Sequence, residues 1–251
     1  MRKRLTLTLL ICFVLVSCDE TQIVDIVSDL TGGSPGMVLI PAGEVELGAL
    51  VGDVPAVFVT RGSVSRRQTV YVDAFYIDTH EVTIAEYKKF VDATGYVDSS
   101  YNWYKESTPQ HPIFASHDAA AAYAEWAGKR LPTRSEWEKA ARGGLVGQRY
   151  PWGDAAATEN HARFSETGAG HIPKPYTVPV GRYEPNSYGL YDMAGNVSEW
   201  IATDPGDTFT ALCGGSWRGS EMTLRVYYSE RLHVAGHYNA AGFRCVKDIP
   251  D

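Results

Sequence analysis

Two cysteines, Cys213 and Cys245, are the thiols that the chain carries beyond its N-terminal region. A thiolate can act as a nucleophile, bind a soft metal such as Cu(I), or join a second thiol in a disulfide. The pair flanks Gly214–Trp217 and Gly242–Arg244, two segments that we expect to form neighbouring strands. A disulfide between Cys213 and Cys245, which an oxidising compartment would allow, and two buried free thiols acting as small apolar groups both stay open. A copper–thiolate site made by these two is not expected.

Two histidines, His233 and His237, lie four residues apart. On a helix this spacing would place both imidazoles on one face, where they could bind a metal ion. Gly236 lies between them, no helix is predicted there, and no nearby carboxylate completes a ligand set. We therefore expect histidines of a surface loop. The sequence contains no nucleophile elbow, phosphate-binding loop, zinc-protease helix or dinucleotide fingerprint.

The same stretch, residues 218–239, combines rigid aromatic and small polar side chains, a mixture that suits a recognition surface. The alternative is an ordinary, partly buried C-terminal segment. The candidate contact residues are Arg218, Tyr227, Tyr228, Arg231, His233, His237, Tyr238 and Asn239.

Composition limits what the chain can recognise. It has 251 residues, a net charge of −7 and a pI near 5.5. This acidic balance shows no nucleic-acid-binding footprint. The 24 glycines, 15 tyrosines and 6 tryptophans indicate a loop-rich fold rather than a helical bundle.

The first 18 residues have the order of a bacterial lipoprotein leader. Arg2, Lys3 and Arg4 precede a short apolar run, and Leu15–Cys18 matches a lipobox. We expect residues 1–18 to be a signal peptide ending at a lipidated Cys18, which would anchor the protein to a membrane outside the cytoplasm. A plain signal peptide is the alternative. Residues 19–36, acidic and ending in Gly, Ser and Pro, are interpreted as a flexible tether.

The elements that must position these side chains belong to one predicted domain, residues 37–247. Strands are expected over 37–48 and 68–77 from their apolar alternation. Helices are expected from Thr83 to Gly95, from Asp118 to Ala127, and from Thr133 or Ser135 to Gly143. Beyond residue 145 turns are dense and periodicity is weak.

A series of short strings, in order along the chain, resembles the formylglycine-generating enzyme or sulfatase-modifying-factor family. The strings are Met37–Gly43, Tyr76–Thr83, Trp126–Thr133, Glu136–Glu138, Ala140–Gly143, Tyr150–Gly153, Asn186–Trp200, Gly214–Trp217 and Ala241–Arg244. The resemblance implies an α+β fold, the family's variant of the C-type lectin fold, with few helices, short mixed sheets and much irregular chain.

The family's enzyme oxidises a cysteine of sulfatases to formylglycine with copper held by two cysteines. The resemblance places those two positions at Gly219 and Leu224, which cannot bind copper. Copper is therefore not expected.

The resemblance also implies a structural calcium loop. Its ligands would be the side chains of Asp192 and Glu199 and the carbonyls of Gly195 and Val197, since Ca²⁺ prefers oxygen donors. A turn without an ion is the alternative.

Three functions follow from these observations. We favour a lipid-anchored binding or scaffolding protein that acts on an unknown protein or small ligand. An oxidoreductase of the same superfamily on another substrate, and a surface display protein diversified in its C-terminal segment, are the alternatives.

Overall fold

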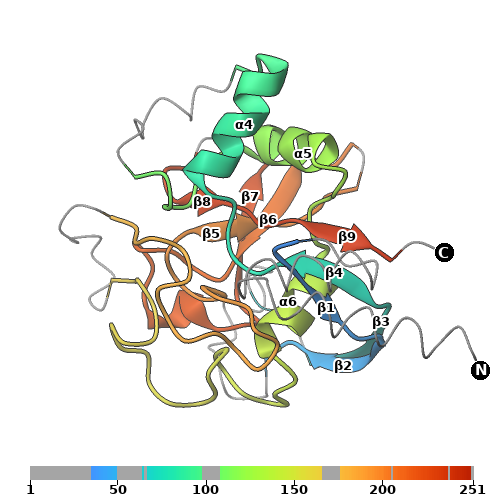
Figure 1. Ribbon diagram of the computed structural model, residues 1–251. Coiled ribbons are helices and arrows are strands. Elements are labelled where there is room, and N and C mark those ends of the chain that lie inside the picture. Colours follow the sequence, from blue (N-terminus) through green and yellow to red (C-terminus); the bar gives the residue numbers. More distant parts are fainter. Residues whose placement is uncertain are drawn as a thin grey trace, which may run out of the picture.

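The computed structural model describes residues 35–49, 64, 67–97, 108–165, 176–204, 206–236 and 238–249 (Figure 1). Cys18, His237 and most of the expected tether lie outside these ranges. Within them the fold is α+β, with three α-helices and short sheets joined by long irregular segments, as the sequence predicts. No helix among these residues has the length and apolar character needed to cross a membrane.

The N-terminal strands form two linked antiparallel ladders. β1 (Met37–Ile40) pairs with β4 (Phe75–Asp78), and β2 (Gly43–Leu47) pairs with β3 (Gln68–Val72). The single strand expected over 68–77 is wrong, because the pairing stops at residues 73 and 74. These residues lie opposite Pro41 and Ala42, and proline has no N–H to continue a ladder. The chain therefore changes sheets there, and β4 goes on to pair with β9 (Val246–Asp248).

Capping residues set the three helices. α4 (Ile84–Thr94) begins at Thr83 in a capping box with Glu86 and ends at Gly95, as predicted. α6 (Arg134–Arg142) begins at Thr133 in a second capping box and ends at Gly143, which settles the choice between Thr133 and Ser135. α5 (His117–Trp126) begins one residue earlier than predicted. Its cap is the hydroxyl of Ser116, which accepts from the N–H of Ala119, and not Asp118.

The C-terminal sheet has the order β7-β6-β5-β8. Its strands are β5 (Ser198–Trp200), β6 (Phe209–Cys213), β7 (Ser229–His233) and β8 (Ala241–Gly242), and η2 (Glu221–Leu224) is a short 3₁₀ turn between β6 and β7. The expectation that the segments beside Cys213 and Cys245 are neighbouring strands is wrong, because β5 lies between β6 and β8. The sequence strings could not predict this strand order, because their glycines do not specify which strands pair.

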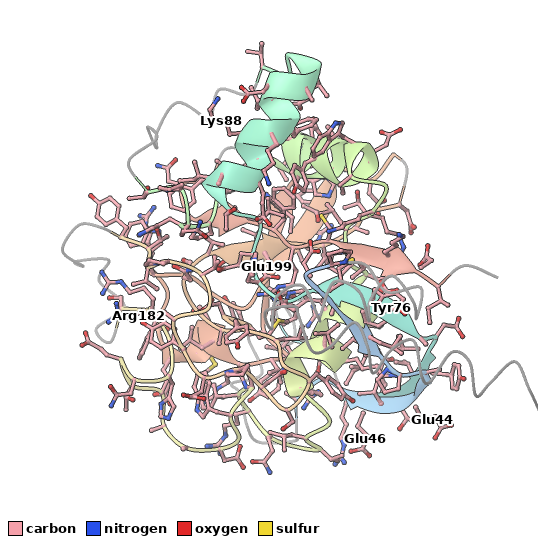
Figure 2. The ribbon with its side chains drawn as sticks, in the orientation of Figure 1. Glu44, Glu46, Tyr76, Lys88, Arg182 and Glu199 are labelled. Carbon is pink, nitrogen blue, oxygen red and sulfur yellow. The ribbon has the colours of Figure 1, made fainter. Side chains whose placement is uncertain are left out.

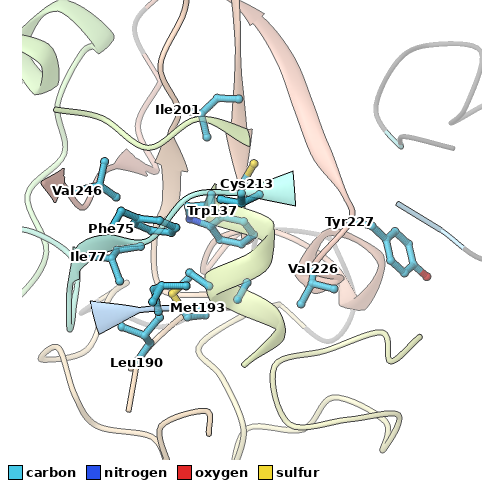
Figure 3. Close-up of a cluster of buried hydrophobic side chains, with 14 of the residues drawn as sticks. Phe75, Ile77, Trp137, Leu190, Met193, Ile201, Cys213, Val226, Tyr227 and Val246 are labelled. Atoms are coloured by element: carbon cyan, nitrogen blue, oxygen red, sulfur yellow. The ribbon is translucent and has the colours of Figure 1, made fainter. Parts of the chain in front are cut away.

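Two apolar clusters cover the two sides of this sheet. α4 and α5 lie together over one side (Figure 1), where they pack with Trp200, Leu212 and Phe243. α6 lies on the other side, and Trp137, fully buried, packs there among Phe75, Ile77, Met193 and Cys213 (Figure 3). Successive residues of a strand point to opposite sides. The neighbours Leu212 and Cys213 therefore enter different cores.

Candidate functional site

The C-terminal sheet also divides the predicted recognition surface between its two sides. In the register of β6 and β7, Leu212 is opposite Glu230, and Ala211 is opposite Arg231. Directly opposed residues share a side of the sheet. Glu230 and Arg231 therefore face different surroundings, and each side opens into its own depression.

The first depression, here called the C-terminal pocket, lies on the side of Leu212 and Glu230 and has a volume of about 350 Å³. Four predicted contact residues line it: Arg218, Tyr228, Tyr238 and Asn239. The other lining residues are Ser198, Leu212, Gly215, Ser216, Gly219, Thr223, Glu230, Leu232 and Ala240. The pocket is thus lined by polar and apolar groups in about equal measure, with hydroxyl, amide and charged groups beside leucine and tyrosine side chains.

Arg231 and His233 lie on the opposite side of the sheet, with the half-exposed ring of Phe209. The Arg231 guanidinium is 4.0 Å from the centre of that ring, and the His233 ring meets it edge-on at 5.6 Å. This second depression, about 400 Å³, opens beside Thr133 and Arg134 at the start of α6. Arg231 and His233 therefore cannot act in the C-terminal pocket.

Tyr227 is part of the core rather than of either surface, with 1% of its area exposed. Arg134 of α6 binds the Tyr227 carbonyl (2.8 Å) and the Ser229 hydroxyl, so the segment leading into β7 is fixed to the helix. The structure therefore divides the predicted recognition residues between two depressions and buries Tyr227. The alternation of side chains along the strand at 229–233 could have predicted that Glu230 and Arg231 lie on opposite sides of the sheet. Glu230 and Thr223 are pocket residues that the sequence analysis missed.

The two positions that the resemblance assigns to copper ligands are closed in this fold. A Cβ atom added to Gly219 would overlap Thr223 Oγ1, and one added to Gly215 would lie 2.7 Å from the same oxygen. That hydroxyl is held in place, since it donates to the Ser220 carbonyl at 2.8 Å. Leu224 is fully buried in the cluster with Tyr150 and does not line the C-terminal pocket. Thr223 thus fills the space that a side chain at 219 would need.

A buried ion pair lies at the centre of the molecule, where Figure 2 labels Glu199. The Arg244 guanidinium binds both carboxylate oxygens of Glu199 at 2.8–3.0 Å, and Trp137 Nε1 donates to Glu199 Oε2 at 2.7 Å. Arg244 also donates to the carbonyls of Asp78, Thr79 and Tyr191. The Glu199 charge raises the pKa of Arg244 against the opposing effect of burial, so the guanidinium stays charged. The pair joins β5 to the chain that follows β8.

Glu81 and Asp192 add two buried carboxyl groups beside this pair. Glu81 accepts from Asn196 Nδ2 at 2.9 Å and from the N–H of Val197 at 3.2 Å. Burial, and then the charges of Asp192 and Glu199, raise the pKa of Glu81 well above its usual range. Burial likewise raises the pKa of Asp192. Asp192 Oδ2 accepts from Gly181 at 2.6 Å, and Oδ1 has no partner among the described residues.

The predicted calcium ligands do not fit calcium as a set in this geometry. Both carboxylate oxygens of Glu199 already accept hydrogen bonds, from Arg244 and from Trp137. Asp192 keeps one free buried oxygen, as a cation ligand would. Among the described residues no three His, Cys, Asp or Glu side chains are grouped so that they could hold a metal ion. Calcium at this loop stays a prediction, with Asp192 as the side chain that remains available.

Cys213 and Cys245 are both free and buried, and they belong to different clusters on opposite sides of the sheet. The structure thus has two free thiols, and the disulfide alternative is not formed, because β5 separates the two segments. Burial raises the pKa of Cys213 to about 12 and that of Cys245 well above its usual range. Neither thiol is therefore available as a thiolate near neutral pH.

We expect both thiols to resist alkylation in the native protein and to react once it is unfolded. Iodoacetamide at pH 8, read by intact mass on the mature protein, should add no group to Cys213 or Cys245. In guanidinium without reductant it should add two. Two additions that require a reductant would show a disulfide, and additions to the native protein would contradict the burial of these thiols.

The comparisons with known proteins agree with this architecture. Residues 25–249 match the sulfatase-modifying factor enzyme 1-like domain. The formylglycine-generating enzyme of Thermomonospora curvata is 35% identical over 218 residues, which cover 66% of this chain and 71% of that one. The enzyme of Bos taurus is 33% identical over 68% of this chain and 59% of its own length. The structure of PvdO from Pseudomonas aeruginosa superposes with a TM-score of 0.69 at 22% identity, over 85% of this chain and 94% of that one.

The fold and the C-terminal sheet define an α+β protein built on the family's variant of the C-type lectin fold. The chain belongs to the formylglycine-generating enzyme or sulfatase-modifying-factor family. The chain spans less than two thirds of the bovine enzyme, so the activity of that whole protein does not transfer by length or identity alone.

Proposed function

We propose that this chain is a binding protein that keeps the frame of the family and does not oxidise cysteine to formylglycine. The observation that carries the proposal is Thr223, whose side chain fills the space beside Gly219, while Leu224 is buried away from the pocket. None of the described residues that line the C-terminal pocket carries a thiol. The pocket instead offers hydroxyl, amide and charged groups, which suit the recognition of a small polar ligand or a protein segment.

The family itself favours one alternative, an enzyme of this superfamily that uses another metal or substrate. The relatives from Thermomonospora curvata and Bos taurus are named as formylglycine-generating enzymes. Such an enzyme would need a bound metal ion, and the residues that line the C-terminal pocket do not account for metal binding. For the third alternative, a diversified display protein, no observation on the described residues adds support.

Metal analysis and oxygen consumption separate the binding protein from the enzyme. The mature chain, loaded with Cu(I) and desalted, is expected to keep no stoichiometric copper and to consume no oxygen with a cysteine-containing sulfatase peptide. The Thermomonospora curvata enzyme, treated identically, is the positive control. Stoichiometric copper together with aldehyde formation on the peptide would overturn the proposal.

We propose further that the protein is lipid-anchored at Cys18 and lies outside the cytoplasm. The support is the order of positive residues, apolar run and lipobox in residues 1–18. Wild type is expected to incorporate a palmitate analogue, whereas the Cys18→Ser variant is expected to carry no such label. Incorporation of the analogue by the serine variant would contradict the anchor at Cys18.

A further inference from the structure

The C-terminal pocket holds two side chains of opposite charge, Arg218 after β6 and Glu230 on β7. Both are exposed. Within the described part of the chain neither enters an ion pair, with the other or with a third side chain. The Arg218 guanidinium lies 5.5 Å from the centre of the Trp217 ring, a contact that limits where it can move. The pocket therefore presents one cationic and one anionic group, both available to a ligand.

The rest of the lining is neutral. Ser198, Ser216, Thr223 and Asn239 supply hydroxyl and amide groups, and Leu212 and Leu232 supply an apolar wall. A simple anion such as phosphate would gain from the arginine and be repelled by the glutamate, and a simple cation would meet the reverse. A wholly apolar ligand would leave both charges without partners. A ligand that itself carries both charges meets neither penalty.

The volume of the C-terminal pocket limits the class of ligand further. A volume of about 350 Å³ is at the lower end of small-molecule pockets, which begin at about 300 Å³. One amino acid fits such a space, and a folded partner does not. Tyr228 and Tyr238 also line the pocket, and Tyr238 packs edge-on against buried Trp200 at 5.6 Å. Their rings give an apolar side chain flat surfaces to contact.

We propose that the C-terminal pocket binds a free α-amino acid as its zwitterion, an inference that rests on the proposed binding function. Arg218 takes the carboxylate, which suits its forked donors. Glu230 takes the ammonium group, and the side chain lies toward Leu212 and Leu232. The match of both charges distinguishes this ligand from amines and from carboxylic acids of the same shape.

Calorimetry with three matched probes tests the proposal on the mature chain. L-leucine is expected to bind. Leucinol, which lacks the carboxylate, and 4-methylpentanoate, which lacks the amine, are each expected to bind at least tenfold more weakly, because each lacks one of the two charges that the pocket pairs.

Two charge-removing variants assign the ends of the ligand. Arg218→Gln should weaken leucine binding at least tenfold without weakening the binding of leucinol, since leucinol has no carboxylate for Arg218 to pair. Glu230→Gln should weaken leucine binding likewise without weakening the binding of 4-methylpentanoate, which has no ammonium group for Glu230 to pair. Arg231→Gln, on the opposite side of the sheet, is the matched control and should bind leucine as wild type does. Circular dichroism confirms that each variant is folded.

The proposal is overturned if none of the twenty standard amino acids shifts the melting temperature or gives heat, or if leucine and leucinol bind equally. Either of these results, obtained together with no retained copper and no oxygen consumption, contradicts the amino-acid ligand but leaves the proposed binding function standing. Oxygen consumption on a cysteine peptide removes the proposed function itself, so the two failures are distinguishable.

Discussion

Arg244→Met lowers the free energy of unfolding by about 3–5 kcal/mol, because it leaves the charge of Glu199 buried without its partner. Arg244 is fully buried and uses its donors on Glu199 and on three backbone carbonyls. Methionine fills part of the volume and supplies none of these bonds. For a domain of this size the midpoint of thermal unfolding should fall by on the order of 10 °C. Guanidinium titration of the mature chain measures the change.

Arg231→Met is the matched control, because that guanidinium is exposed and lies over Phe209 on the surface. Its stability should change little. The double variant Glu199→Gln/Arg244→Met should recover much of the loss, since no charge is then buried alone and the glutamine amide can still accept from Trp137. A loss below about 1 kcal/mol for Arg244→Met would contradict the role of the pair.

The same titration decides about calcium. If the charge of Arg244 neutralises the charge of Glu199, EDTA leaves the wild-type midpoint of guanidinium unfolding unchanged. If calcium balances it, calcium chloride raises the midpoint, EDTA lowers it, and Arg244→Met is mild. Three buried carboxyl groups, Glu81, Asp192 and Glu199, face one guanidinium. Burial is the main cause that raises the pKa values of both Glu81 and Asp192, which favours their protonated, uncharged forms.

Local signals account for what the sequence predicted well. The capping boxes at Thr83 and Thr133 lie within four residues of the groups they satisfy, so pattern and structure agree there. At α5 the prediction began the helix at Asp118, whereas the observed cap, Ser116, lies two residues earlier. Short-range chemistry therefore predicted the helix ends to within two residues.

Long-range pairing accounts for what the sequence could not predict. Glu199 meets Arg244 across 45 residues, and Glu81 reaches Asn196 across 115. The sequence string around Asp192 indicates a turn. It does not show that Glu199, at the end of the same string, forms an ion pair with Arg244. The disulfide hypothesis failed for the same reason, since only the sheet order places β5 between the two cysteine-bearing segments.

Placing cysteines at the two positions that the resemblance assigns to copper ligands is not expected to create a copper site. The variant Gly219→Cys/Leu224→Cys is expected to be less stable than wild type and to retain no stoichiometric Cu(I). At 219 the new Cβ overlaps Thr223 Oγ1, and overpacking of this kind costs about 1–3 kcal/mol. At 224 the smaller side chain opens a cavity in the cluster with Tyr150 and Phe164, for a further loss of about 1–3 kcal/mol.

Thr223→Ala, added to that variant, separates the two causes. It removes the overlap at 219, so the triple variant should regain the first loss and keep the second. Thr223→Ala alone is the control for the lost hydrogen bond to Ser220. Tight Cu(I) binding by the double variant, with Thr223 in place, would show that the pocket adapts more readily than its packing suggests. Copper binding only in the triple variant would identify Thr223 as the side chain that prevents copper binding at the positions assigned by the resemblance.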